Sequence, residues 1–153
     1  MKKILLLMTI AIAALSCEGP MGPQGPKGDV ADWFVNFYVV GERSNQYEYG
    51  YWESLGDGKF QCVFDIPELD DFVYNEGIVN VFFMQDMDTN NEIQVGFPHI
   101  FFYEDYGKTY TATYTFDMQK IKGKMGSIAF NVAYSDFIDA PPPACTFRVA
   151  MIW

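Results

Sequence analysis

Residues 110–116 read Tyr-Thr-Ala-Thr-Tyr-Thr-Phe and form the clearest strand pattern in the chain. Apolar or aromatic residues alternate with threonine throughout this stretch. Because successive side chains of a β-strand point to opposite faces, this period of two predicts a strand with one buried face. We expect that face to carry Tyr110, Ala112, Tyr114 and Phe116.

Turn signals and aromatic-rich runs alternate along the rest of the chain from residue 31 onwards. We expect strands at 33–40, 47–53, 59–66, 78–86, 92–97, 100–103, 109–118, 127–135 and 146–153. Tight turns are predicted at 56–58 and 88–91, and a loop with at most one helical turn at 68–77. This spacing predicts an all-β fold, with a single immunoglobulin-like antiparallel β-sandwich at residues 31–153.

The N-terminus carries a targeting signal. Two lysines precede an apolar run at 4–15, which is too short for a transmembrane helix and fits a secretory signal. Residues 14–17, Ala-Leu-Ser-Cys, resemble a lipobox, so we predict a lipoprotein signal peptide at 1–16 and lipidation of Cys17. Leu15 stands one position later than the usual lipobox leucine, so ordinary cleavage after Ser16 is the alternative.

A collagen-like stem follows the signal peptide. Together with the lipidated Cys17, it makes up residues 17–30. Glycine recurs at every third position, at Gly19, Gly22, Gly25 and Gly28, and proline follows three of these glycines. Only glycine fits at the axis of a collagen triple helix, but four triplets are too few to trimerise alone. The stem is therefore either a monomeric polyproline-II spacer or part of a homotrimer that the C-terminal domain helps to hold together.

Composition limits the partners of this chain. Half of its 153 residues are hydrophobic and 18% are aromatic, which is enough for one well-packed domain. Its formal net charge is −10, and removal of Lys2 and Lys3 with the signal leaves 8 basic and 20 acidic residues, a net charge of −12. Such a surface repels phosphate backbones, so we expect no nucleic-acid partner.

Four segments carry a family resemblance: Phe64-Asp65-Ile66-Pro67-Glu68-Leu69, Val73-Tyr74-Asn75-Glu76-Gly77-Ile78-Val79, Tyr134-Ser135-Asp136-Phe137 and Thr146-Phe147-Arg148-Val149. With the signal and the triplets, they resemble a family of small Bacteroidetes lipoproteins that have a short collagen-like stem and a C-terminal β domain. The resemblance implies an outer-membrane lipoprotein held by its N-terminal acyl chains, and it implies no activity. Surface export in that phylum uses acidic residues after the lipidated cysteine. Here Glu18 is the only acidic residue between Cys17 and the first triplet, so the sequence does not decide between the surface face and the periplasmic face of the outer membrane.

His99 is the only histidine, and it lies beside Pro98 between two predicted strands. We expect a structural role at a strand corner, and no hydrolase triad or multi-histidine metal site.

The polar stretch 86–92 resembles the start of a calcium loop at Asp86, Asp88, Asn90 and Glu92. Asn91 and Phe97 stand where such a loop needs glycine and glutamate, so we interpret the stretch as a hairpin turn. We predict no metal and no cofactor.

Cys62 and Cys145 remain in the mature domain. An oxidising compartment favours a disulfide between them, and burial as free thiols is the alternative.

An aromatic group comprises Tyr47, Tyr49, Tyr51 and Trp52. It is a candidate platform for stacking sugar rings, although packing within the sheet, where aromatic residues are generally favoured, is the interpretation that we prefer. A period of two places the three tyrosines on one face and Trp52 on the other.

These features predict a membrane-anchored lipoprotein of the cell envelope whose β domain is a non-catalytic interaction or structural module. The alternative is a glycan-binding surface lipoprotein that serves uptake or adhesion. We do not expect an enzyme, because the sequence offers no set of general acid and base candidates around a cleft.

Overall fold

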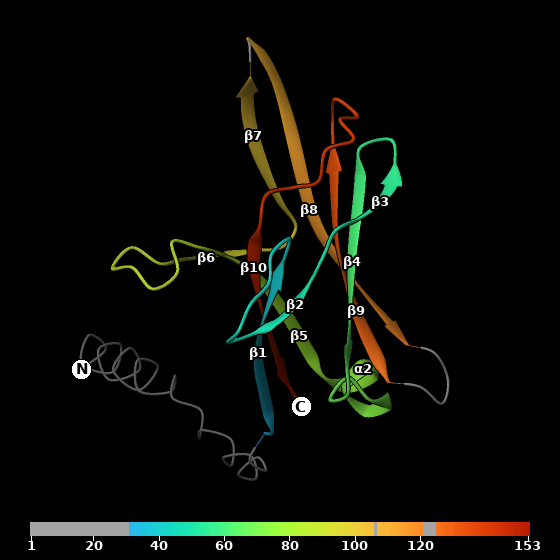
Figure 1. Cartoon of the computed structure of the whole chain (residues 1–153). Coiled ribbons are helices and arrows are strands. Elements are labelled where there is room, and N and C mark those ends of the chain that lie inside the picture. Colours follow the sequence, from blue (N-terminus) through green and yellow to red (C-terminus); the bar gives the residue numbers. More distant parts are fainter. Residues whose placement is uncertain (1–30, 106, 121–124) are drawn as a thin grey trace, which may run out of the picture. The chain divides into compact units, whose positions relative to one another are not determined.

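The protein is seen in a computed structural model that describes residues 31–105, 107–120 and 125–153 (Figure 1). The predicted signal peptide, Cys17 and the stem glycines lie outside these residues. The elements in chain order are β1 (Trp33–Val40), β2 (Glu48–Gly50), β3 (Glu53–Gly56), β4 (Lys59–Ile66), α2 (Asp71–Glu76), β5 (Ile78–Gln85), β6 (Ile93–Gly96), β7 (His99–Asp105), β8 (Lys108–Lys120), β9 (Gly126–Tyr134) and β10 (Cys145–Ile152). Within the described ranges, no helix is long and apolar enough to cross a membrane.

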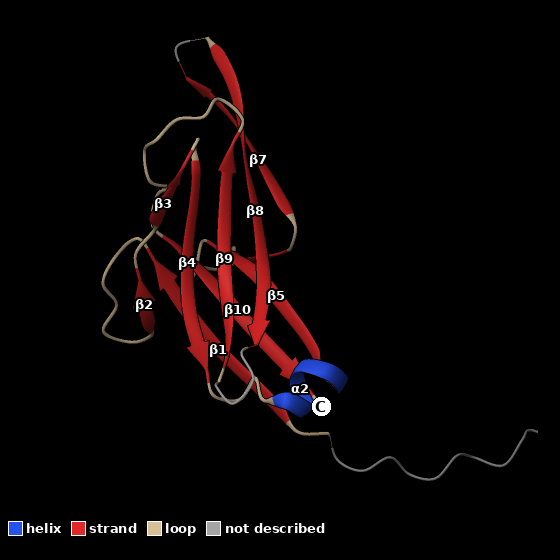
Figure 2. Cartoon of the chain, turned by 90° about the vertical axis from the view of Figure 1, so that its right-hand side faces the viewer, coloured by secondary structure: helices blue, strands red, loops and turns tan. Residues whose placement is uncertain are grey.

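The strands form two five-stranded sheets that face each other in a β-sandwich (Figure 2). The first sheet has the order β2-β1-β10-β5-β6, and the second has the order β3-β4-β9-β8-β7. Neighbouring strands are antiparallel except for the parallel pair of β1 and β2. Asp32 and Trp153 extend the pairing of β1 with β10 by one more pair of backbone hydrogen bonds. Each donates its backbone N–H to the carbonyl of the other, at N···O distances of 2.8 and 3.0 Å.

The prediction of an all-β domain is confirmed. The strands expected at 33–40 and 59–66 coincide with β1 and β4, and most others differ only at their ends. β7 is longer than expected and includes His99. The alternating stretch at residues 110–116 lies in β8, where Ala112 and Tyr114 are fully buried.

One expected strand, 47–53, is wrong. It is divided into β2 and β3, which belong to different sheets, and residues 51–52 connect them. At Gly50 the sheets approach so closely that a Cβ atom would lie 2.6 Å from the sulfur of Cys62. The ring of Trp52 packs edge-on against Phe147, with centroids 6.3 Å apart, and holds the connection against the core. A period of two cannot reveal that a chain changes sheets, because side chains continue to alternate across the crossing.

The core is an aromatic cluster that joins the two sheets. Phe130 on β9 and Phe147 on β10 stack with centroids 4.2 Å apart and planes 20° apart. Phe147 also contacts Phe83 and Phe97, each at 5.6 Å between centroids. Aromatic pairs at these distances stabilise a core beyond the area that they bury.

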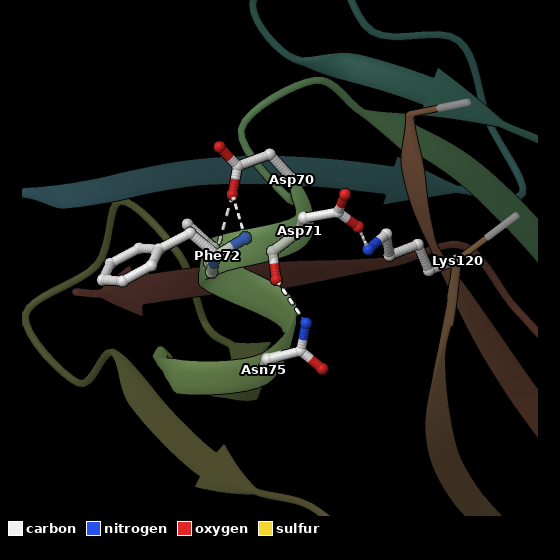
Figure 3. A network of polar contacts seen from close by, with 6 residues as sticks. Asp70, Asp71, Phe72, Asn75 and Lys120 are labelled. Carbon is white, nitrogen blue, oxygen red and sulfur yellow. Dashed lines mark hydrogen bonds and ion pairs between the residues drawn. The ribbon is translucent and has the colours of Figure 1, made fainter. Parts of the chain in front are cut away.

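The short helix α2 is held by polar contacts at its start (Figure 3). Asp70 caps it, because one carboxylate oxygen accepts the backbone N–H groups of Phe72 and Val73 at 2.9 Å each. Such a cap satisfies donors that have no partner in the first helical turn. The carboxylate of Asp71 forms an ion pair with Nζ of Lys120 at the end of β8, which ties the helix to the second sheet.

Phe147→Ala should lower the free energy of unfolding by about 3–5 kcal/mol, because it leaves a cavity where several rings meet. Urea denaturation would measure this loss. The control is Phe102→Ala on β7, whose ring is 76% exposed and which should cost less than about 1 kcal/mol. Equal losses in the two variants would contradict the central role of Phe147.

Candidate binding cleft

A cleft of about 410 Å³ lies over the end of β1, on the face of the first sheet that is turned away from the core. Its floor includes Val39 and Thr146, which pair across β1 and β10. One wall is the 42–47 segment between β1 and β2, and the other consists of Met87 and Asp88 in the turn after β5. Three separate parts of the chain therefore build the cleft.

The 42–47 wall is held in shape by its own hydrogen bonds. The hydroxyl oxygen of Ser44 accepts the backbone N–H groups of Gln46 and Tyr47 at 3.2 and 2.9 Å. The side-chain amide of Gln46 donates to the hydroxyl of Tyr47 at 2.9 Å. The ring of Tyr47 lies 5.2 Å from that of Phe37 on β1, measured between centroids. These contacts fix Tyr47 at the cleft.

The opposite wall is the turn that resembles the start of a calcium loop. Thr89 donates both its hydroxyl and its backbone N–H to the carbonyl of Asp86, at 2.6 and 3.2 Å. Asp86 and Asp88 have φ angles of 52° and 61°, a left-handed conformation that aspartate adopts more readily than most residues. Among the described residues, no group of three or more His, Cys, Asp or Glu side chains is placed to hold a metal ion.

The lining offers hydrogen-bonding groups of both kinds. Glu42 and Asp88 supply carboxylates, Arg43 supplies a guanidinium, and Asn45 and Gln46 supply side-chain amides. Val39 adds an apolar surface between them. A small ligand with several hydroxyl groups and an apolar face has the matching chemistry, because binding sites combine apolar walls with a few placed polar groups.

The predicted aromatic group is only partly assembled. Tyr49 pairs in register with Val39 and so borders the floor of the cleft. Tyr49 and Tyr51 are 42% and 60% exposed, and their rings meet edge to face at 6.1 Å between centroids. Trp52 faces the core instead, as the period of two predicted, and is separated from the tyrosines.

Cys62 on β4 and Cys145 on β10 lie in opposite sheets, and both are free, buried thiols. Burial raises the pKa of Cys62 to about 11, and Glu53 adds to the increase. Burial also raises the pKa of Cys145, with a further contribution from Cys62. Both thiols are therefore protonated at neutral pH, whereas the thiolate is the reactive form.

His99 lies outside the cleft, at the first position of β7. Its ring meets that of Phe101 edge to face, with centroids 4.4 Å apart. The residue thus lies within a strand, and not between two strands as the sequence predicted.

The 42–46 residues of the cleft were missed by the sequence argument. They form a run of consecutive polar residues between two strands, Glu-Arg-Ser-Asn-Gln, which is a signal for a loop but not for a site. Tyr47 and Asp88 were each singled out, but for different reasons, and no feature of the sequence indicates that they share a cleft.

We compared the chain with protein-family models, with curated proteins and with solved structures, and nothing matched it. The interpretation of the cleft therefore depends on its own residues.

Ser44→Ala should loosen the 42–47 wall without unfolding the domain, because it removes an oxygen that accepts two backbone N–H groups. Hydrogen exchange at Gln46 and Tyr47 should become a few-fold to about tenfold faster. The control is Ser54→Ala, which removes a comparable contact to Asp139 at 2.7 Å elsewhere in the domain. If Ser54→Ala accelerates the same two amides, or Ser44→Ala does not, the wall is not held by Ser44.

Proposed function

We propose that the protein is a lipid-anchored component of the cell envelope and that its β-sandwich is a non-catalytic interaction module. The observation that carries the proposal is the position of the cleft relative to the chain entry. The chain enters the domain at Ala31, directly before β1, and the cleft lies over the far end of this strand. Eight extended residues span roughly 25 Å, so the cleft and the attachment of the stem are at opposite ends of the domain.

The sequence supports the anchor. A signal of 16 residues is followed by Cys17 and by the Gly-X-Y triplets, in the order expected for a lipidated cysteine with a tether. A single acyl chain binds a membrane only marginally, whereas a bacterial lipoprotein cysteine carries several and is held firmly. The family resemblance to small Bacteroidetes lipoproteins points to the outer membrane and is part of the same proposal.

An immunoglobulin-like type for the sandwich also belongs to this proposal. Immunoglobulin domains place one cysteine of each sheet and a tryptophan in the core. Cys62, Cys145 and Trp52 have comparable places here, although the two thiols are free. The described strands exceed the seven or nine of immunoglobulin domains, partly through the short edge strands β2 and β3.

Cys17→Ala tests the anchor. Without the thiol that is acylated, the precursor should not be processed by lipoprotein signal peptidase, and the chain should be lost from the outer-membrane fraction. Fractionation of cells that express the wild type and the variant measures both effects. If the variant stays with the membranes as the wild type does, the protein is not anchored in this way.

Glycan binding is the second candidate, and the exposed pair of Tyr49 and Tyr51 beside a polar cleft favours it. Sugar rings bind aromatic faces through their apolar surfaces, while their hydroxyl groups need donors and acceptors. Arg43, Glu42 and Asp88 provide these groups within the same cleft.

If glycans bind there, Tyr49→Ala should weaken binding to any glycan retained by the wild-type protein on an array by at least about tenfold, because truncation of an aromatic contact costs about 2 kcal/mol. Phe102→Ala, which removes an exposed ring from β7, should leave the signal unchanged. Equal losses from the two substitutions would place the glycan elsewhere, and a lack of any retained glycan would remove this candidate.

A further inference from the structure

The strand β7, which forms the edge of the second sheet, differs from the other edge strands (Figure 2). Within the described ranges, β2, β3 and β6 end their sheets with three or four residues each, and the pairing of β3 with β4 contains a register shift. β7 has seven residues, contains no proline or lysine, and pairs with β8 without a shift. Shortness, bulges, proline and lysine are what usually keeps an edge strand from pairing with another chain. β7 has none of these protections.

The backbone of β7 directs alternate residues toward its open edge. The carbonyl of Thr111 on β8 accepts the N–H of Ser135, which directly follows β9, at 3.0 Å, so the backbone of Thr111 faces β9. In an antiparallel strand the next residue faces the other neighbour, and Ala112 therefore faces β7. Ala112 is in register with Phe101. The N–H and C=O groups of Phe101 are thus directed toward β8.

Three residues of β7 direct their backbone groups away from β8. They alternate with Phe101 along the strand and are Ile100, Phe102 and Glu104. In the part of the chain that the structure describes, no strand pairs with β7 on this side. The side chains of Ile100 and Phe102 are 47% and 76% exposed. A strand added to this edge would therefore meet three N–H groups, three carbonyls and two apolar side chains.

We propose that the open edge of β7 pairs with the same edge of a second copy of this chain, so that their second sheets become continuous. The two β7 strands are antiparallel and centred on Phe102, which lies opposite itself. Ile100 then lies opposite Glu104 of the other copy, and every outward-facing backbone group has a counterpart. A shift by two residues in either direction pairs only five of the seven residues of β7.

The residues of this edge suit a second copy of the same chain. The chain has a formal net charge of −10, so two copies repel each other over much of their surfaces. Only one of the three outward-facing residues, Glu104, is charged. Antiparallel pairing places the two Glu104 positions roughly 14 Å apart along the strands, each opposite an isoleucine. The two Phe102 rings become direct cross-strand neighbours, an arrangement that stabilises sheets.

The contact is small, and the dimer is therefore transient. Two strands that pair over seven residues cover less than about 1,000 Å², which is typical of weak association. Each backbone hydrogen bond contributes modestly, because the same groups bind water in the monomer. We therefore expect monomers at about 1 µM and dimers at about 500 µM. The pairing depends neither on the cleft nor on the membrane anchor, so its test is separate from the tests of the proposed function.

Sedimentation of the full mature protein in detergent, with micelles in excess over protein, measures the dimer. The protein mass of the wild type should double between the two concentrations. Phe102→Pro should stay monomeric, because it removes an N–H that points to the second copy and none that points to β8. Proline is tolerated at such positions of an edge strand. Urea denaturation shows whether the variant folds.

Two control variants separate the backbone from the ring. Phe102→Ala keeps the N–H group and should weaken the dimer no more than about fivefold, the upper range for one cross-strand pair. Trp33→Ala removes a ring that is 73% exposed but lies on β1 of the other sheet. It should dimerise as the wild type does.

Cysteine cross-linking tests the register and does not depend on the proline variant. The Cα atoms of a hydrogen-bonded antiparallel pair are about 5.5 Å apart, a distance that a disulfide spans. Treated with a copper–phenanthroline oxidant at about 500 µM, Phe102→Cys should form covalent dimers. Glu104→Cys should form at least about tenfold fewer, because its two positions are too far apart. The native cysteines are the same in both variants.

Four results would overturn the proposal. They are a wild type that stays monomeric at about 500 µM, a folded Phe102→Pro that dimerises as the wild type does, loss of the dimer in Trp33→Ala, and equal cross-linking of Phe102→Cys and Glu104→Cys. Hydrogen exchange identifies any other occupant of the edge. Slow exchange of the Ile100 and Phe102 amides at about 1 µM, where the copies are apart, would mean that something other than a second copy covers the edge, and it would also exclude self-pairing.

Discussion

The stack of Phe130 on Phe147 is the contact on which the rest of the domain depends, because it joins the two sheets at the centre of the core. Phe147 lies on β10, between β1 and β5, so the rings around it come from both sheets and from the connection at Trp52. Each sheet alone would expose one apolar face to water, and only their packing against each other removes that surface. The positions of β1, β5 and β10, and hence of everything at their ends, follow from this packing.

Much of this arrangement could be predicted from the sequence, because alternation is a local property. The pattern of Tyr110 to Phe116 identified β8, and the same reasoning located β1 and β4 to the residue. The sequence could not reveal the crossing at Tyr51 and Trp52, because the side chains keep alternating where the backbone changes its hydrogen-bond partners. It also could not reveal strand order. The pairing of β1 with β10 joins the two ends of the domain, and no local pattern encodes a contact between residues so far apart.

The cleft illustrates the same limit for function. Its floor is a cross-strand pair, Val39 and Thr146, and its walls come from two connections distant in sequence. The sequence identified Tyr47 as a candidate for stacking sugars and Asp88 as part of a turn, but it could not place them on one surface. Glu42 and Arg43 carried no signal beyond polarity, because loop residues that bind a ligand obey no periodicity. A site built from loops becomes visible only when the strands beneath it are positioned.

The orientation of the strands gives the domain two different ends. β1 and β10 are antiparallel neighbours, so β1 begins and β10 ends at the same end of the domain, where Trp33 pairs with Ile152. β5 runs in the same direction as β1, because both are antiparallel to β10, and it therefore also begins at that end. The connections that follow β1 and β5 must then emerge together at the opposite end, where they form the two walls of the cleft. The separation of the cleft from the point where the chain enters the domain is thus a consequence of the strand order.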